Sequence, residues 1–370
     1  MRAHPLFESV PNFSEGTRGE IVAAFAGAAA LAHVLDVDAD VDHNRVVVSL
    51  AGTASHVADA LLASMQVAID HIDLREHRGV HPRVGAADVV PIVPLGAATL
   101  GAAHELAREL GERVWTEQHV PVYFYGHDEP HTLADIRARR VTPDLGGPDL
   151  HASAGAVCIG VRRPLLAFNV LLPGATQVVA RALARSLREA NGGLRGVQAL
   201  AFTLPGGVMQ LSMNLFRLEE TPPAAVIAEL EQRSVVIGPQ QVIGLCPAAA
   251  ANESAVGRLL EGRLAAAAAR RGAELCAAKG DDEHLRLAAR LEQVAGQLAG
   301  SGIEQEELLA AAERAVALIG VLVAAGVLDH ELQSMLDIAA RGLRAALLPT
   351  TLSQRAARVT ALDRTLEAKD

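Results

Sequence analysis

The composition of the chain changes near residue 250, and this change limits the possible folds more than any other feature. All ten aromatic residues lie before position 217, and sixteen of the seventeen prolines lie before position 248. Beyond this point the sequence is rich in Ala, Leu, Arg and Glu, which are strong helix formers. We therefore predict an all-α region over residues 251–370, preceded by a region of different architecture.

Before residue 250, predicted strands and helices alternate in two similar sets. Residues 6–126 give a β-α-β-β-α-β order followed by one more strand, in the manner of a split βαβ unit. The long amphipathic stretch 54–72 and the apolar stretch 88–95 are the clearest helix and strand. Residues 156–247 repeat a comparable mixture. The fold class expected is therefore α/β, with two ferredoxin-like mixed subdomains at 1–155 and 156–250 followed by the all-α region.

Charge and hydropathy exclude several classes of protein. The net charge of −10 argues against non-specific nucleic-acid binding, which requires a basic surface. The longest apolar run, residues 315–328, is too short to span a bilayer and favours a buried helix. The first residues lack the apolar segment of a signal peptide, and the three cysteines lack a CxxC spacing. We expect a cytoplasmic protein without a membrane or nucleic-acid partner.

The stretch RGVHPRVGAAD, residues 78–88, places a histidine directly before a proline. A residue before proline is pushed out of the helical region, so we expect His81 in a loop that leads into the strand at 88–95. A constrained histidine and a nearby arginine, Arg83, suit catalysis in a loop. The alternative is a histidine that hydrogen-bonds the backbone beside a surface arginine.

Other polar clusters invite metal or nucleotide interpretations that the spacing does not support. Residues 36–45 carry acids at alternate positions but lack the glycine and the late glutamate of a calcium loop. His77 and His81 are four residues apart, yet Gly79 and Pro82 make a helical zinc motif improbable. Neither GxGxxG nor a P-loop is present. We therefore predict no metal site, and a solvated acidic turn is the simpler interpretation of residues 36–45.

Six blocks of sequence resemble one known family. They are ESVPNFSEG (8–16), LDVDADVDHNR (35–45), REHRGVHPRVGAADVVPIVPL (75–95), PVYFYG (121–126), PDLGGPDLHASAGAVCIGVRRPLLAFNV (143–170) and QQVIGLCP (240–247). In this order they are similar to glutamate formiminotransferase, which is also the transferase domain of the bifunctional formiminotransferase-cyclodeaminases. The resemblance covers about residues 7–250. Residues 251–370 are shorter than a cyclodeaminase domain and lack its glycine-rich start.

The resemblance implies a fold, a reaction and a set of site residues. The family has a cleft between its two α/β subdomains and transfers a formimino group from N-formimino-L-glutamate to N5 of tetrahydrofolate in histidine degradation. The family's catalytic histidine corresponds to His81, and its assisting strand-end aspartate corresponds to Asp38. Tetrahydrofolate is then the co-substrate, and no metal is required. The folate-contacting segment corresponds to Ala154, Gly155, Ala156, Val157, Cys158, Ile159, Gly160, Val161, Arg162 and Arg163.

Further residues are candidates for binding the two carboxylate-bearing substrates. Arg45 and Arg83 suit bidentate carboxylate binding, as do the two arginines that end the folate segment. Asn12, Asn169 and Asn214 are further candidates, although a buried asparagine more often bonds a turn. The glycines at 155 and 160 suggest close approach by a flat ligand. A formyl-glutamate transferase and a non-catalytic folate-binding homologue remain alternatives, and we expect a homo-oligomer, most simply a homodimer.

Overall fold

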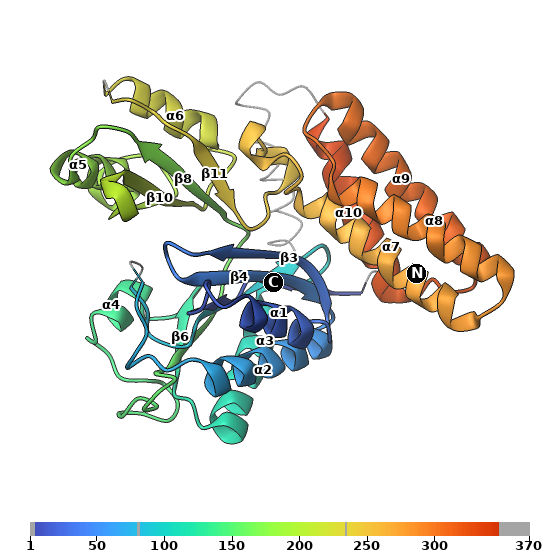
Figure 1. Cartoon of the computed structure of the whole chain (residues 1–370), viewed down its shortest axis with the longest axis horizontal. Helices are drawn as coiled ribbons and strands as arrows, with labels where there is room; N and C mark the ends of the chain where they lie inside the picture. Colours follow the sequence, from blue (N-terminus) through green and yellow to red (C-terminus); the bar gives the residue numbers. More distant parts are fainter. Residues whose placement is uncertain (1–3, 80–81, 234, 348–370) are drawn as a thin grey trace. The chain divides into compact units, whose positions relative to one another are not determined.

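A computed structural model describes residues 4–79, 82–233 and 235–347. The chain divides into two compact units, the first ending at Arg163 and the second beginning at Pro164. Each unit is built around its own β-sheet (Figure 1).

The first unit contains a seven-stranded sheet. Across the sheet the strands follow the order β3, β4, β1 with β2, β5, β7, β6, because β1 and β2 both pair with β4 and β5. β5, β7 and β6 run parallel, and the other pairs are antiparallel. The strands are β1 Leu6–Ser9, β2 Asn12–Phe13, β3 His33–Asp40, β4 Arg45–Gly52, β5 Ala87–Leu95, β6 Val122–Gly126 and β7 Val157–Val161.

Helices α1, α2 and α3 cover one face of this sheet and form the main core with it, whereas Ile136 of α4 packs with Tyr123 and Cys158 on the other face. Phe13, Phe25 and Leu61 are fully buried between the sheet and α1 and α2, and α3 packs on β5 and β7 (Figure 1). Threonine side chains cap α2 and α3, as Thr99 does by accepting a hydrogen bond from the backbone N of Ala102 at 3.1 Å. The helical elements are α1 Gly19–Ala29, α2 Ala54–His71, α3 Leu100–Arg113, the π-helix η1 Val114–Gln118 and α4 Leu133–Arg137.

The second unit begins with a four-stranded antiparallel sheet of order β11, β8, β10, β9. Phe168, Leu211 and Met213 point to the same buried core as α5 and α6. The strands are β8 Leu166–Leu172, β9 Val197–Thr203, β10 Met209–Leu215 and β11 Gln240–Ile243. The helical segments are α5 Gln177–Leu187, α6 Pro223–Glu231 and the 3-10 turns η2 Glu189–Asn191, η3 Pro205–Gly207, η4 Ala248–Ala250 and η5 Glu253–Ala255.

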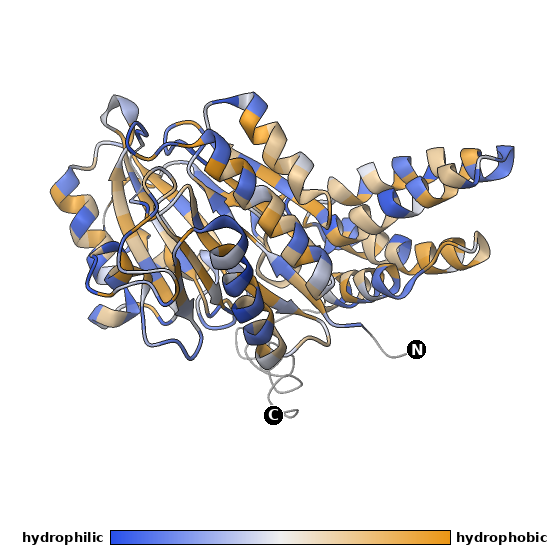
Figure 2. Cartoon of the chain, turned by 90° about the horizontal axis from the view of Figure 1, so that it is seen from below, coloured by the Kyte–Doolittle hydropathy of each residue, from blue (hydrophilic) through white to orange (hydrophobic). Residues whose placement is uncertain are grey.

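Four long helices follow the second sheet within the same unit (Figure 1). Asp281 and Asp329 cap two of them by accepting backbone hydrogen bonds. The helices carry hydrophobic and hydrophilic residues side by side along their length, as expected where one face packs and the other meets water (Figure 2). They are α7 Leu260–Lys279, α8 Asp282–Ala299, α9 Gln305–Ala324 and α10 His330–Ala346.

The structure confirms the predicted fold class and changes one detail of it. The mixed α/β region and the all-α region are both present. The apolar run at 315–328 is not a buried helix: α9 ends at Ala324, and Val316 and Val323 on it are 40% and 60% exposed. When every residue of a segment is apolar, the sequence has no polar positions to mark which side of the helix faces water. The divisions at residues 155 and 250 remain predictions about domains.

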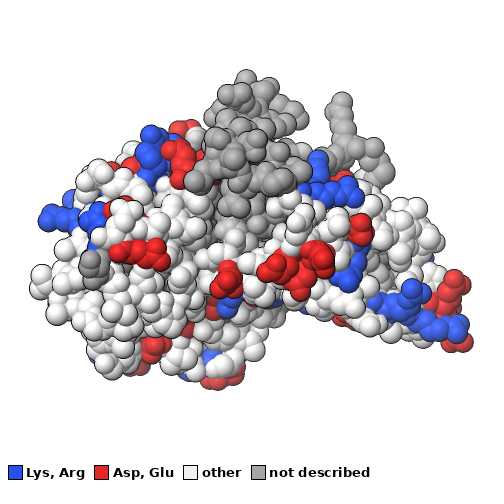
Figure 3. Space-filling model, turned by 90° about the horizontal axis from the view of Figure 1, so that it is seen from above, with Lys and Arg blue, Asp and Glu red and all other residues white. Residues whose placement is uncertain are grey.

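No helix in the described ranges is both long and apolar enough to cross a membrane. Basic and acidic side chains are interspersed on the face drawn in Figure 3.

Candidate active site

The loop that precedes β5 is tied to the turn between β3 and β4. Asn44, in a left-handed conformation in that turn, donates from Nδ2 to the carbonyl of Arg78 at 2.8 Å. Arg83 Nη2 donates to the carbonyl of His43 at 3.3 Å. His81 lies outside the described residues, but the chain on both sides of it is therefore held against the β3–β4 turn.

Gly79 allows this close approach. A Cβ atom at this position would lie 2.6 Å from the carbonyl oxygen of His43 and 2.5 Å from Nη2 of Arg83. Any other residue would push the loop away from the turn.

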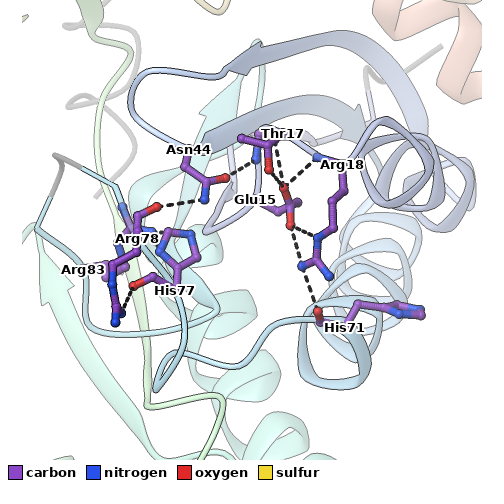
Figure 4. Close-up of polar contacts among 9 residues, drawn as sticks. Glu15, Thr17, Arg18, Asn44, His71, His77, Arg78 and Arg83 are labelled. Atoms are coloured by element: carbon purple, nitrogen blue, oxygen red, sulfur yellow. Dashed lines mark hydrogen bonds and ion pairs between the residues drawn. The ribbon is translucent and has the colours of Figure 1, made fainter. Parts of the chain in front are cut away.

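Glu15 lies in the turn between β2 and α1 and is fixed by donors from that same turn. Its Oε1 accepts hydrogen bonds from the backbone N and hydroxyl of Thr17 and from the backbone N of Arg18, at 2.8 to 2.9 Å. Its Oε2 accepts from Arg18 Nε at 2.5 Å (Figure 4). Burial raises the pKa of Glu15, but these hydrogen bonds outweigh it and lower that pKa to about 2. Glu15 is thus a permanent anion with filled hydrogen bonds, and a structural role fits it better than proton transfer.

A pair formed by buried His43 and half-buried Asp40 occupies the β3–β4 turn. His43 Nδ1 lies 2.8 Å from Asp40 Oδ2, and the backbone N of His43 donates to Asp40 Oδ1 at 2.8 Å. Burial raises the pKa of Asp40, but its hydrogen bonds with His43 and the nearby imidazole charge lower it overall. Asp40 therefore holds the His43 ring in one orientation.

His77 lies beside the guanidinium of Arg83, with Arg83 Nη1 2.6 Å from His77 Nε2 (Figure 4). Burial and the arginine charge both lower the pKa of His77. The neutral form of His77 is therefore favoured, and its ring is already in contact with the Arg83 guanidinium.

Asp38 and Asn12 share the sheet face opposite the helices. In the strand register both residues pair with Val47 of β4, Asp38 from β3 and Asn12 from β2. Residues directly opposite one another on paired strands point to the same face, and two strand spacings amount to about 10 Å. Asn12 also donates to the carbonyl of Val10 at 2.8 Å. The structure thus brings these two predicted site residues onto one surface.

Arg45 belongs to a charged group at the amino end of β5. Burial lowers its pKa, and the carboxylate of Asp88 opposes that shift. Asp88 is itself buried, accepting from the backbone N of Val84 at 2.5 Å and pairing with Arg137 Nη2 at 3.3 Å. The Nε of Arg137 is buried with no hydrogen-bond partner among the described residues. A guanidinium donor directed at no acceptor suits an anionic ligand group.

The predicted folate segment coincides with β7 in the interior of the sheet. Val157, Ile159 and Val161 face the main core, and Cys158 faces a second cluster formed by the chain after β6. Only Arg162 and Arg163 are partly exposed. Burial lowers the pKa of Arg162, and the nearby Tyr125 and Glu8 oppose that shift. Ligand contact through this segment therefore has to use its arginine end.

The glycines of this segment have a structural explanation. A Cβ at Gly155 would lie 2.3 Å from the carbonyl oxygen of Val84, and one at Gly160 would lie 2.1 Å from that of Tyr125. Close approach at both positions is by the protein's own backbone, so these glycines give no independent sign of a flat ligand.

Asn169 and Asn214 lie on one face of the second sheet. Asn169 pairs with Ser212 of β10 and with Gln241 of β11, and Asn214 pairs with Ala167, two residues before Asn169. This face is opposite the apolar core, and on it the Oε1 of buried Gln210 has no hydrogen-bond partner within the described part of the chain. The result is a polar sheet face with an unused acceptor.

Sequence reasoning missed His43 and Asp40 as a pair and undervalued Asn44 and His77. The acidic spacing at 36–45 suggested a turn, and the structure shows that this turn positions the loop carrying His81. The asparagine at position 44 was the one available signal of a tight turn here, since Asn tolerates the left-handed backbone conformation.

The fold and these clusters define a two-sheet α/β protein with charged and polar groups on the sheet faces away from the helices. Residues 6–162 match the model of the formiminotransferase domain, N-terminal subdomain. A Thermoplasma acidophilum protein named glutamate formimidoyltransferase is 36% identical over 268 residues, which cover 65% of this chain and 88% of that protein. A Streptococcus pyogenes protein of the same name is 30% identical, covering 66% of this chain and 90% of the relative.

Longer relatives match over the same region. The Gallus gallus formimidoyltransferase-cyclodeaminase is 34% identical over 65% of this chain, which spans half of that protein's length. The chain belongs to the formiminotransferase family.

Proposed function

We propose that this protein is a glutamate formimidoyltransferase, an enzyme that moves the formimino group of N-formimino-L-glutamate to N5 of tetrahydrofolate in histidine degradation. The observation that carries the proposal is the 36% identity to a glutamate formimidoyltransferase over 88% of that relative. The loop that precedes β5 and carries His81 is anchored against the β3–β4 turn, and this supports the proposal because the turn joins the strands that carry Asp38 and Arg45.

The reaction needs two proton transfers around one carbon. N5 of tetrahydrofolate attacks the formimino carbon, and a tetrahedral intermediate forms. N5 then loses its proton, the bond from the formimino carbon to the glutamate nitrogen breaks, and that nitrogen takes up a proton. We assign both transfers to His81, because one imidazole with a pKa near neutrality accepts a proton and returns it. No metal takes part in these steps.

Charged and polar residues supply binding and stabilisation. Asp38 stabilises the cationic amidinium carbon in the transition state. Arg45, Arg83 and the arginine end of the 154–163 segment bind substrate carboxylates. Asn12, Asn169 and Asn214 bind the remaining polar groups, supported by their positions on the polar sheet faces. Holding the two substrates in register supplies much of the rate.

A spectrophotometric assay with formiminoglutamate and tetrahydrofolate tests the proposal. His81→Ala is expected to lower kcat about 100-fold or more, as for loss of general acid–base catalysis, with folate affinity largely retained. His56→Ala, on the exposed start of α2, is the matched control and should leave kcat unchanged.

Three outcomes would contradict the assignments. Near wild-type turnover in His81→Ala would remove the catalytic role of His81. Turnover with formyl-glutamate but not formiminoglutamate would favour the formyl transferase. Folate binding without turnover of either donor would make the protein a non-catalytic homologue.

We further propose that the protein acts in the cytoplasm as a homodimer, with domains at 1–155, 156–250 and 251–370. Three buried free thiols are compatible with a reducing compartment.

Leu309, Val316 and Val323 on α9 are exposed at seven-residue intervals, which gives an apolar stripe for a second copy of the chain. Val316→Glu is expected to shift the mass measured by light scattering to the monomer. An unchanged dimer mass would remove α9 from the interface.

A further inference from the structure

Two histidines and an aspartate converge where β6 ends beside α3. His104 projects from α3, and His127 and Asp128 directly follow β6. One ligand atom from each of the three residues lies within 4.8 Å of the others. The two imidazole rings are 5.8 Å apart between centroids and inclined by 57°.

The ring nitrogens facing this point are buried without partners. His104 Nε2 and His127 Nδ1 are both inaccessible to water and lack hydrogen bonds within the described residues. Asp128 Oδ2 lies 2.9 Å from His127 Nδ1, but the alignment is not that of a hydrogen bond. Buried polar atoms in native proteins are almost always satisfied. Two imidazole nitrogens and a carboxylate oxygen that converge on one point form a donor set able to hold a cation.

The surroundings hold the donors in place. The backbone N of His127 donates to the carbonyl of Val161 at 2.8 Å, which fixes the residue to the end of β7. Asp128 adopts a left-handed conformation, with φ of 58°, that turns the chain back beside His127. Glu129 is nearly buried, with Oε1 4.0 Å from Nδ1 of His104. Zinc-binding histidines usually have a carboxylate near their second ring nitrogen, and Glu129 lies on that side of His104, although 4.0 Å is longer than a hydrogen bond.

A positive group balances that outer carboxylate. Arg108 pairs with Glu129 through Nη2 and lies over the ring of Phe124, 3.9 Å from its centroid. Glu129 is therefore neutralised by Arg108, and Asp128 provides the anionic ligand.

We propose that His104, His127 and Asp128 bind a divalent transition-metal ion, with Zn²⁺ the expected occupant. Two imidazoles and one carboxylate are borderline nitrogen and oxygen ligands that suit zinc rather than Mg²⁺ or Ca²⁺. Donor atoms bound to one tetrahedral zinc ion at about 2.0–2.1 Å lie roughly 3.4 Å apart, so the spacing between these ligand atoms, at most 4.8 Å, is close to what zinc requires. Water completes the coordination.

This site is separate from the proposed chemistry. It lies at the carboxyl ends of the parallel strands, whereas the loop carrying His81 enters at the amino end of β5. β5 has nine residues, so the two ends of the sheet are roughly 25 Å apart. The ion would clamp α3 to the end of β6, and the proposal departs from the expectation of a chain without metal.

Calorimetric titration of the chelator-treated full chain with ZnCl₂ tests the proposal. We expect saturable binding of one Zn²⁺ per chain, weakened at least tenfold by His104→Gln and by His127→Gln. His56→Gln, another histidine of the first unit, is the matched control and should bind like the wild type.

A second probe keeps the test decisive if the variants fail to fold. Co²⁺ bound to the wild-type protein should give the intense visible absorption of a four-coordinate site, and Zn²⁺ should abolish it. Absence of saturable Zn²⁺ binding, equal binding by the folded glutamine variants, or an octahedral Co²⁺ spectrum would each overturn the proposal.

Discussion

Glu15 keeps its charge inside the first unit because four donors surround it. Its pKa of about 2 in the folded protein lies below its ordinary value of 4.5. A carboxyl group with a lowered folded pKa stabilises the fold fully above its unfolded pKa, and this contribution is lost as the pH falls through the folded pKa. The contribution is therefore complete above pH 4.5 and disappears toward pH 2.

Glu15→Gln should remove this contribution at neutral pH. The shift corresponds to at most about 3 kcal/mol in the free energy of unfolding. Urea unfolding of the wild type and of Glu15→Gln between pH 3 and pH 7 measures the difference in their free energies of unfolding. The contributions of the other carboxyl groups are the same in both proteins and cancel in this difference. The stability gap should be constant above pH 5 and narrow at lower pH. A gap independent of pH would show that Glu15 acts through packing alone.

Gly155 shows a second kind of constraint on a single residue. It has a φ of 71°, and a Cβ there would meet the carbonyl oxygen of Val84 at 2.3 Å. Gly174 has a similar φ of 74° with nothing within 4 Å of the added atom. Substitution at Gly174 therefore measures backbone strain alone, whereas substitution at Gly155 measures strain together with a steric clash.

Gly174→Ala should cost only the left-handed strain, about 1 kcal/mol. Gly155→Ala should cost clearly more, about 3 kcal/mol in all, because β7 has to move away from the loop before β5. Thermal unfolding measured by circular dichroism distinguishes the two substitutions. Equal losses would mean that the contact with Val84 relaxes freely.

The loop predicted for His81 lies outside the described residues, but at the residue scale sequence patterns correctly placed Asp38 near the end of a strand, because strand periodicity acts locally. They could not identify the bond from Asn44 to the carbonyl of Arg78, which joins residues 34 positions apart. They also could not predict that Gly155 is required for the close approach of its backbone to the carbonyl oxygen of Val84. Such contacts depend on strand register, and register is a property of the folded sheet.

At the scale of elements, the start of α7 is joined to the end of the second sheet. The backbone N of Leu260 donates to the carbonyl of Cys246 at 2.9 Å. Glu261, buried in the first turn of α7, accepts from the backbone N of Ala248 at 2.9 Å. Burial raises the pKa of Glu261, and the hydrogen bond from Ala248 opposes that shift. The glutamate thus links α7 to the turn that follows the sheet.

α10 crosses α7 at this same glutamate. A Cβ at Gly342 of α10 would lie 2.5 Å from Cγ of Glu261, whereas one at Gly320 of α9 would meet nothing within 4 Å. Both glycines lie inside helices, where alanine is intrinsically preferred by about 1 kcal/mol.

Gly320→Ala should therefore stabilise the protein by up to about 1 kcal/mol. Gly342→Ala should destabilise it by about 1–2 kcal/mol, since overpacking exceeds the gain in helix propensity. Urea midpoints of the two variants give the comparison. If Gly342→Ala were also stabilising, the crossing of α7 and α10 would be looser than its geometry indicates.

Over the whole molecule, the change in composition near residue 250 correctly predicted where the helices begin. It could not predict that the chain from Pro164 onward forms one compact unit. Composition reports which elements form, whereas unit boundaries depend on which surfaces those elements cover. Here η4 packs against α10, and the strand-like bridge from Cys246 to Leu259 continues from the sheet into the helical region.

A chain ending at residue 250 tests this coupling. The residues proposed for catalysis and binding all precede that point, so turnover per folded molecule should persist. The second sheet would nevertheless lose the partners of Cys246 and Ala248, and Ala248 and Ala250, now buried, would become exposed. We expect a melting temperature lower by several degrees than that of the full chain, together with aggregation on heating. Equal melting temperatures would show that the helices are an independent addition, and a soluble truncated protein that binds folate without turnover would place part of the active site in the helices.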